Sequence, residues 1–276
     1  MRVTESISEL RTIRRAMNGI FGLIPTMGAL HDGHASLIRR ARLECDHVGV
    51  SIFVNPAQFG QGEDLGKYPR SLNNDLALLE SLGVDTVWTP PPEEAYPAGY
   101  QTWITVENVS NPLEGSVRPG HFRGVATVVA KLLNIFMPNR AYFGQKDAQQ
   151  VAVIRRMAAD LNFAADIVVS QTVREADGLA MSSRNAYLNT SERRAAPALY
   201  RALSAAKAKF EAGEKNAEAV KAAALSALSA EPLVNVQYVS VSDPDTIEEL
   251  TEISGGALIS AAVIIGKTRL IDNVLL

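Results

Sequence analysis

The sequence has a single cysteine, Cys45, among its 276 residues. One cysteine can form neither a disulfide within the chain nor a thiolate cluster around zinc, so both are excluded. The longest apolar stretch, residues 255–266, is shorter than the roughly 20 residues that a membrane-spanning helix needs. Residues 1–20 carry charge throughout and contain no apolar core of a secretion signal. We therefore expect a cytoplasmic protein with no membrane partner.

Positive charge is not in excess either. The chain has 27 Lys and Arg residues against 30 Asp and Glu residues, which gives a formal net charge of −3. A nucleic-acid-binding surface needs a surplus of cations, so we expect no nucleic-acid partner. The hydrophobic fraction of 47% and the charged fraction of 21% are ordinary for globular proteins.

Three common catalytic or nucleotide-binding signatures are missing. The glycine-rich loop GxxxxGK[ST] is absent, which excludes a P-loop enzyme. The dinucleotide-binding pattern GxGxxG and the serine nucleophile pattern GxSxG are absent too. Any nucleotide site must therefore be built differently.

The first two thirds of the chain alternate between strand-like and helix-like segments. Predicted strands cover residues 20–24, 48–54, 84–88, 141–144 and 166–170, and predicted helices cover 34–44, 75–82, 122–136 and 147–161. Strands that alternate with helices predict a Rossmann-like α/β domain, in which a parallel sheet carries helices on both faces. We assign residues 1–173 to it.

The composition changes after residue 172. The alanine-rich stretch 195–230 predicts two helices that are broken near Gly213. Three strand-like runs follow, at 234–241, 258–265 and 270–275. These features predict a smaller α+β domain over residues 174–276.

Residues 25–34, PTMGALHDGH, lie between a predicted strand and a predicted helix. Ligands of open parallel sheets bind at such junctions. Glycines let the backbone approach a ligand, and the helix N-terminus attracts anions. His31 and His34 are three residues apart and would face one pocket, where imidazoles suit phosphate oxygens. A metal site, with two imidazoles as an incomplete ligand set, and a purely structural role remain alternatives.

Polar side chains also follow two other predicted strands. Asn55 and Gln58 are neutral hydrogen-bonding groups that suit hydroxyls, although a simple turn explains them as well. Lys146 offers a cation to a phosphate. Asp147 is either a helix cap or an acceptor for ribose hydroxyls, and Gln150 lies one turn further on the same side as Lys146.

Two more segments suit anions. Arg118, His121 and Arg123 lie within six residues at a predicted helix start, where they form either an anion site or an exposed basic loop. Residues 181–185, MSSRN, combine two hydroxyls with a guanidinium and fit a polyphosphate.

Acidic side chains that could hold Mg²⁺ follow the second predicted strand. They are Glu63, Asp64 and Asp75. Solvated surface is the alternative for each of them.

An HxGH motif near the N-terminus and an MSSR motif after the sheet resemble the nucleotidyltransferase superfamily that includes class I aminoacyl-tRNA synthetases. The longer strings PTMGALHDGH, FVNPAQF, YPR, RPGHFRGVATVV, GQKDAQQ and MSSRN resemble the pantothenate synthetase (pantoate–β-alanine ligase) family, in order from about residue 20 to 190. Gln145 stands where that family often has glutamate.

The resemblance implies a two-step reaction. The carboxylate of pantoate attacks the α-phosphate of ATP, and the amine of β-alanine then attacks the resulting pantoyl adenylate. Mg²⁺ accompanies ATP, and the protein is a homodimer whose second domain, hinged near residue 174, acts as a lid. The implied catalytic residues are His34 as proton donor, His31 and Lys146.

The resemblance also implies binding residues. Those for ATP are Met27, Gly28, Ala29, Leu30, His31, Asp32, Gly33, His34, Gly144, Gln145, Lys146, Asp147, Val173, Met181, Ser182, Ser183 and Arg184. Those for the acid substrate are Gln58, Gln150, Asn55, His121 and Arg118, and Asp75 is the expected metal ligand.

Three other functions compete with this one. A different adenylyl- or cytidylyltransferase would share the HxGH motif but should lack two glutamines placed for a polyhydroxy acid. An aminoacyl-tRNA synthetase fits poorly with the acidic charge balance. A protein that binds ATP without chemistry is disfavoured by the presence of both His34 and Lys146.

Overall fold

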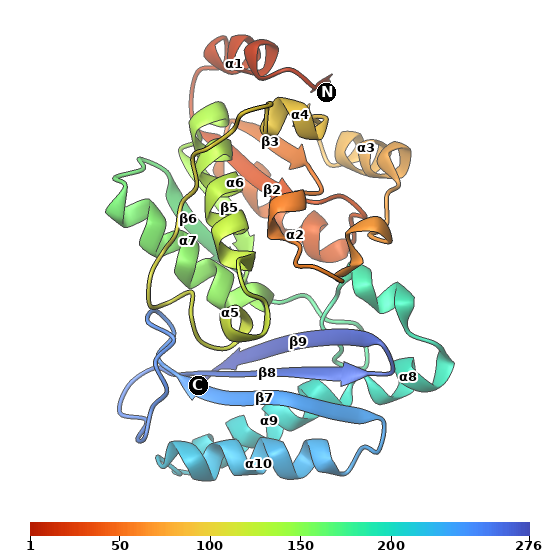
Figure 1. Cartoon of the computed structure of the whole chain (residues 1–276), viewed down its shortest axis with the longest axis vertical. Coiled ribbons are helices and arrows are strands. Elements are labelled where there is room, and N and C mark those ends of the chain that lie inside the picture. Colours follow the sequence, from red (N-terminus) through yellow and green to blue (C-terminus); the bar gives the residue numbers. More distant parts are fainter.

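The computed structural model describes residues 1–276 and contains two sheets (Figure 1). The larger sheet has six strands in the order β1-β4-β3-β2-β5-β6, and all its pairs are parallel. In that order the strands are β1 (Arg2–Thr4), β4 (Thr86–Trp88), β3 (His47–Ile52), β2 (Phe21–Thr26), β5 (Arg140–Gly144) and β6 (Asp166–Ser170). The chain builds outward from β2 on one side and then crosses to β5 on the other. The gap between the ends of β2 and β5 is therefore the switch point at which parallel sheets bind ligands.

Helices cover both faces of this sheet. They are α1 (Ile7–Arg15), α2 (Asp32–Glu44), α3 (Leu72–Ser81), α4 (Pro92–Ala95), α5 (Glu114–Val117), α6 (His121–Phe136) and α7 (Ala148–Asp160). One core contains buried residues of α6 and α7, and the other contains those of α2 and α3. Adjacent residues of β5 contribute to different cores, Phe143 to the first and Tyr142 to the second, because neighbours in a strand face opposite sides. The predicted Rossmann-like architecture is confirmed.

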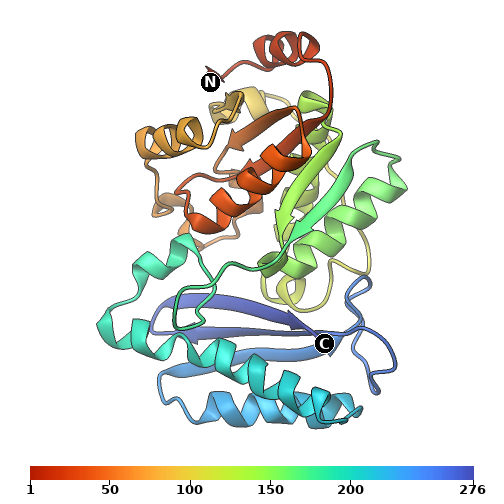
Figure 2. The same cartoon turned by 180° about the vertical axis from the view of Figure 1, so that it is seen from behind.

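The smaller sheet is antiparallel and has the order β7-β8-β9. Its strands are β7 (Val234–Ser242), β8 (Leu258–Ile265) and β9 (Thr268–Leu275), and its helices are α8 (Thr190–Ala195), α9 (Ala198–Glu211) and α10 (Ala217–Ser229). Helices α9 and α10 lie against this sheet (Figure 2), and their buried alanines and leucines belong to a core of their own. This agrees with the predicted smaller α+β unit, whose boundary at residue 174 stays a prediction.

Short 3-10 turns connect several of these elements. They are η1 (Pro56–Gln58), η2 (Asp64–Gly66), η3 (Gln145–Asp147) and η4 (Ser183–Tyr187). No helix combines the length and apolar character that crossing a membrane requires.

The structure differs from the predicted elements at the N-terminus and in β2. Strand β1 and helix α1 were not predicted, because α1 buries only Leu10 and Ile13 among charged residues. Strand β2 runs past the predicted end at residue 24, through Pro25, to Thr26. The ladder from β2 to β5 already ends at Leu23, so Pro25 lies where β2 has left that neighbour and a missing N–H is tolerated.

Candidate active site

A cavity of about 240 Å³ lies at the switch point between β2 and β5. Most of the predicted site residues line it. They are Met27, His31, Gly33, His34, Asn55, Gln58, Arg118, His121, Gly144, Lys146, Asp147, Gln150, Val173, Met181, Ser182, Ser183 and Arg184. The sequence motifs therefore meet in space although they span some 150 residues of the chain.

Six predicted residues do not line this cavity. They are Gly28, Ala29, Leu30, Asp32, Gln145 and Asp75. The first four belong to the loop and first helical turn that carry the two histidines, so they support lining residues without lining the cavity themselves. Gln145 and Asp75 have other partners, which are described below.

The two histidines fix each other at the start of α2. His31 is the N-cap of the helix, and its Nδ1 accepts a hydrogen bond from the Gly33 amide at 3.1 Å. The Nδ1 of His34 accepts from the His31 amide at 3.3 Å, and the two ring centroids are 4.2 Å apart. Because each Nδ1 is an acceptor, the proton of each neutral ring lies on Nε2.

Both rings are neutral at physiological pH. Burial, and after it the neighbouring His31 and Lys146, together lower the pKa of His34 to about 3. Burial and Lys146 also lower the pKa of His31, against the opposing effect of Asp147 and Asp32. Each ring thus offers one N–H to a ligand oxygen as a hydrogen-bond donor without carrying a charge.

The loop before these histidines is held by Asp75. Its carboxylate accepts hydrogen bonds from the amides of Ala29 at 2.9 Å and Leu30 at 2.8 Å, and the side chain is buried. Ala29 has a φ of 49° and Gly28 a φ of 80°, so the loop passes through the left-handed region and needs such an anchor. The structure gives Asp75 this anchoring role in place of the predicted metal ligation, and no group of three His, Cys, Asp or Glu side chains is placed to hold a metal ion.

Lys146 lies in η3 and its side chain is about one-fifth exposed. The nearest carboxylate oxygen, Asp147 Oδ1, is 3.8 Å from Nζ, which is too far for a hydrogen bond. Gln150 lines the same wall from the first turn of α7. Asp147 is at the N-cap position of α7, but its side chain makes no capping hydrogen bond and faces the cavity.

Asn273 of β9 holds the backbone of η3 from the smaller sheet. Its Nδ2 donates to the carbonyls of Gln145 at 2.9 Å and Lys146 at 2.8 Å, and its Oδ1 accepts from Gln145 Nε2 at 3.2 Å. The Gln145 side chain therefore bonds to Asn273 and does not line the cavity, and its contact with ATP stays a prediction. Sequence analysis missed Asn273, because one asparagine in a distant strand carries no local signal.

Asn55 is buried and its amide is fully used. Its Nδ2 donates to Gln58 Oε1 at 3.1 Å and to the Gly124 carbonyl at 3.2 Å, and its Oδ1 accepts from Tyr96 at 2.9 Å. It holds the 55–58 turn against α6 and has no free group for the substrate that the sequence suggested. Gln58 keeps a group to offer, because its Nε2 has only the Met27 sulfur as partner, at 3.1 Å.

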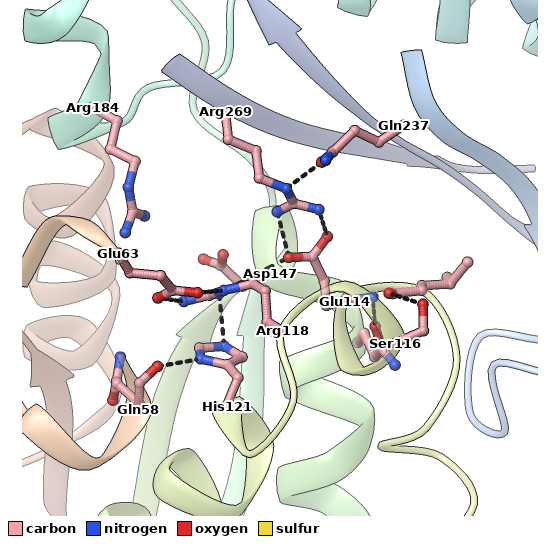
Figure 3. Close-up of polar contacts among 12 residues, drawn as sticks. Gln58, Glu63, Glu114, Ser116, Arg118, His121, Asp147, Arg184, Gln237 and Arg269 are labelled. Atoms are coloured by element: carbon pink, nitrogen blue, oxygen red, sulfur yellow. Dashed lines mark hydrogen bonds and ion pairs between the residues drawn. The ribbon is translucent and has the colours of Figure 1, made fainter. Parts of the chain in front are cut away.

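The two predicted anion-binding arginines are already paired with carboxylates (Figure 3 shows the pair of Arg118 with Glu63). Arg184 donates two hydrogen bonds of 3.0 Å to Asp64, and Arg118 donates two, of 2.7 and 2.8 Å, to Glu63. An anion that approaches either guanidinium must share it with, or displace, that acid.

The segment 118–124 is not the cation cluster that its sequence suggested. Burial, and after it the charge of Arg118, together lower the pKa of His121 to about 4, so the ring is neutral. The guanidinium of Arg123 lies 4.5 Å from the ring centroid of Trp103 on the surface. Only Arg118 brings a charge to the cavity from this segment.

Polar residues of the wall that were missed include Ser51, Tyr68 and Thr172. The hydroxyl oxygens of Ser51 and Thr172 are buried without a hydrogen-bond partner. The Tyr68 hydroxyl is 3.5 Å from Ser183 Oγ. Buried polar groups without partners are uncommon, and the hydroxyls of Ser51 and Thr172 belong to a site where a ligand could satisfy them.

Known proteins resemble this chain along its whole length. The family model described as pantoate-beta-alanine ligase matches residues 2–275. The pantothenate synthetase of Roseiflexus castenholzii is 58% identical over 276 residues, which cover 100% of this chain and 99% of that protein. That of Herpetosiphon aurantiacus is 54% identical over 277 residues, with full coverage of both.

Solved structures agree. A crystal structure of pantothenate synthetase from Thermus thermophilus superposes with a TM-score of 0.95 at 46% identity and covers 99% of each chain. A crystal structure of pantoate-beta-alanine ligase from Francisella tularensis, described as complexed with beta-gamma ATP and beta-alanine, gives a TM-score of 0.80 at 36% identity and covers 100% of this chain and 97% of that one.

Proposed function

We propose, since the chain belongs to the pantoate–beta-alanine ligase family, that this enzyme joins pantoate to β-alanine through a pantoyl adenylate, with release of AMP and pyrophosphate. The observation that carries the proposal is the convergence of neutral imidazoles, a lysine and two glutamines in one cavity at the switch point. The ligands named for the Francisella relative support ATP and β-alanine as substrates.

In the first step a carboxylate oxygen of pantoate attacks the α-phosphorus of ATP. A new P–O bond forms, and the bond to the β-phosphate breaks as pyrophosphate leaves. Two anions repel each other in water, so the site must supply cations and donors. We assign Lys146 to the α-phosphate, where negative charge grows, and the Nε2–H groups of His31 and His34 to phosphate oxygens. Ser182, Ser183 and Arg184 take the outer phosphates.

Pantoate carries two hydroxyls and two methyl groups beside its carboxylate. Gln58 and Gln150 are assigned to the hydroxyls, since both line the cavity. The apolar wall of α6, which includes Val125, Val128 and Val129, suits the methyl groups. Gly144 and Asp147 are assigned to the ribose and Val173 to the adenine.

In the second step the amine of β-alanine attacks the acyl carbon. The new C–N bond replaces the C–O bond to AMP, and the amine loses a proton. Because an acyl adenylate hydrolyses readily, water must be kept out. We propose that residues 174–276 act as a lid, which is supported by the position of the loop 181–185 at the cavity and by the contact of Asn273 with η3.

Mg²⁺ would accompany ATP in this reaction. The side chains around the cavity do not form a dedicated magnesium site, because Asp75 is used by two amides and Asp64 by Arg184. Mg²⁺ commonly keeps several waters and binds mostly to substrate phosphates. We therefore derive no step through a protein-bound metal.

The test is exchange of labelled pyrophosphate into ATP without β-alanine, with a panel of acids. We expect exchange that depends on pantoate. Exchange with an amino acid but not with pantoate would instead identify another nucleotidyltransferase of the HxGH superfamily, and binding of ATP with no exchange would indicate a protein without this chemistry.

We also propose a homodimer that acts in the cytoplasm, from the family resemblance alone. The chain mass is 29.7 kDa, so light scattering at micromolar concentration should give twice that value. A mass near 29.7 kDa would contradict the dimer.

A further inference from the structure

Gln58 is fixed at its backbone as well as at its side chain. The Nδ1 of His121 lies 2.8 Å from the Gln58 carbonyl oxygen (Figure 3). The side-chain Oε1 is held by Asn55. Helix α6 comes so close here that a Cβ on Gly124 would lie 2.2 Å from the Ala57 carbonyl oxygen. The turn that presents Gln58 thus rests directly on the start of α6.

The neighbours of His121 dictate its tautomer. Its Nε2 lies 3.0 Å from Nη1 of Arg118, and a guanidinium can only donate, so Nε2 must accept. The single proton of the neutral ring is therefore on Nδ1 and is donated to the Gln58 carbonyl. With both nitrogens in use and the side chain buried, His121 has no hydrogen-bonding atom left for a substrate.

Arg118 is in turn held from two sides. Glu63 binds its Nε and Nη2 in a bidentate pair, and the Arg118 amide ends α5 by donating to the Glu114 carbonyl at 2.9 Å. Glu114 is buried and receives two hydrogen bonds of 2.6 Å from Arg269 in β9, plus one of 2.7 Å from Tyr238. Figure 3 shows this series of contacts from the smaller sheet to the 55–58 turn.

We propose that His121 and Arg118 are positioning residues that orient Gln58 and do not themselves bind substrate. The proposal rests on the assignment of Gln58 to pantoate made above. This positioning role replaces the direct contact with substrate that the places of His121 and Arg118 in the cavity wall suggest. A guanidinium that is neutralised by a bidentate carboxylate is a poor anion site, whereas it is a firm donor to the ring nitrogen.

Two substitutions of His121 separate its two contacts. In His121→Asn the amide nitrogen can occupy the Nδ1 position, because both atoms are bonded to Cγ, so the donor to Gln58 is kept. In His121→Gln the longer side chain can place an acceptor at the Nε2 position, so the contact with Arg118 is kept and the donor to Gln58 is lost. Pantoate-dependent exchange without β-alanine measures the effect.

We expect His121→Gln to raise the pantoate KM about tenfold, the size of effect for one lost hydrogen bond, with the ATP KM nearly unchanged. His121→Asn should stay within about threefold of the wild type. In a Gln58→Ala background the two variants should become equal, because no side chain is left to orient. Equal pantoate KM values for the two variants while Gln58 is present, or a defect that appears only in the β-alanine KM of the full reaction, would overturn the proposal.

Glu63→Gln is a second variant that decides the matter even where His121→Gln does not fold. If Arg118 positions His121, loosening the bidentate pair should raise the pantoate KM a few-fold and leave the β-alanine KM unchanged. If Arg118 binds an anionic substrate directly, the freed guanidinium should lower a substrate KM. The absence of pantoate-dependent exchange in the wild type would refute the proposed function itself, which distinguishes that failure from the failure of this inference.

Discussion

Two kinds of polar side chain meet in the same cavity. The side chains of Lys146 and Gln150 have no hydrogen-bond partner in the protein, and His31 and His34 each keep one unused Nε2–H. Arg118 and Arg184 are instead paired with Glu63 and Asp64, and Asn55 is bonded to Gln58, Gly124 and Tyr96. Both groups line the cavity, so lining alone does not distinguish a ligand from a support.

The two groups differ in the protein contacts that a ligand must break before it binds. Lys146 gives up only water and a loose 3.8 Å contact with Asp147 for a phosphate oxygen, so most of its effect is available where charge develops. A paired arginine has to give up or share a carboxylate, which cancels much of its gain. We therefore expect larger effects on activity from the loss of an unpaired group than from the loss of a paired one.

The largest effect is expected for Lys146→Ala. A fixed cation at the α-phosphate acts more strongly on the transition state than on bound ATP, so pantoyl adenylate formation should slow by about 100-fold or more. ATP should still bind within about tenfold, because the histidines and the 181–185 loop remain. Single-turnover adenylate formation at saturating ATP and pantoate measures this.

Lys67→Ala is the matched control, since this exposed lysine borders the neighbouring cleft and not the site. It should leave kcat unchanged. If Lys146 only attracts ATP, its loss would raise the ATP KM in a salt-dependent way and leave the single-turnover rate normal.

The next effect concerns the glutamines. Gln150→Ala and Gln58→Ala should each raise the pantoate KM by about tenfold or more, because a site built for hydroxyls loses its specific donors and acceptors. The ATP KM should change little. Gln101→Ala, on an exposed glutamine, serves as the control. Equal changes in the pantoate and ATP KM values would count against both placements.

A smaller effect is expected on how the free energy of unfolding depends on pH. The folded-state pKa values of about 3 for His34 and about 4 for His121 lie below the ordinary value of 6.5. Between pH 7 and 5 the unfolded chain binds protons that the folded chain excludes, so the free energy of unfolding should fall as the pH falls. His121→Asn removes one of these groups, so its free energy of unfolding should fall by about 2 kcal/mol less than that of the wild type over this range.

Urea unfolding at pH 7 and pH 5 checks this expectation. Burial alone would raise the pKa values of Glu63 and Glu114, but their arginine partners outweigh it and hold both below the usual range. The stability that these carboxylates contribute is lost only as the pH falls below about 4.5 and toward their folded-state values, so they do not obscure the histidines. An identical pH dependence in both proteins would show that His121 is not kept neutral.

The smallest effect tests a paired arginine. Asp64→Asn removes the charge that holds Arg184, so the ATP KM should fall about two- to threefold while kcat stays similar. A raised ATP KM would mean that Asp64 aligns the guanidinium for its ligand, and the separation between free and paired groups would then fail at this position.

Local patterns were enough to predict most of the sheet. Strands β6 and β8 have the predicted bounds, and helices α9 and α10 are separated near Gly213 as expected. The positions of the two histidines, Lys146 and Gln150 also followed from strand ends, because parallel strands bring their carboxyl ends to one edge.

The residues that hold the lining side chains in place could not be predicted from local sequence patterns. Arg184 and Asp64 are 120 residues apart, and Asn273 is 127 residues from Lys146. Each such pair is set by tertiary packing, and neither partner carries a local signal. Asp75 shows the same difficulty, because an acid near a ligand loop looks alike whether it binds a metal or two amides.

The 127 residues between Lys146 and Asn273 also matter for the timing of biosynthesis. A ribosome adds about 5–20 residues per second, so roughly 6–25 seconds pass between the synthesis of η3 and the synthesis of Asn273, which holds the carbonyls of η3. During that interval the nascent parallel sheet can form, but its lysine turn has no partner from β9. The polypeptide thus acquires its finished catalytic centre only after translation has passed through the second sheet, and premature termination before β9 would yield a Rossmann-like fragment without an anchored lysine.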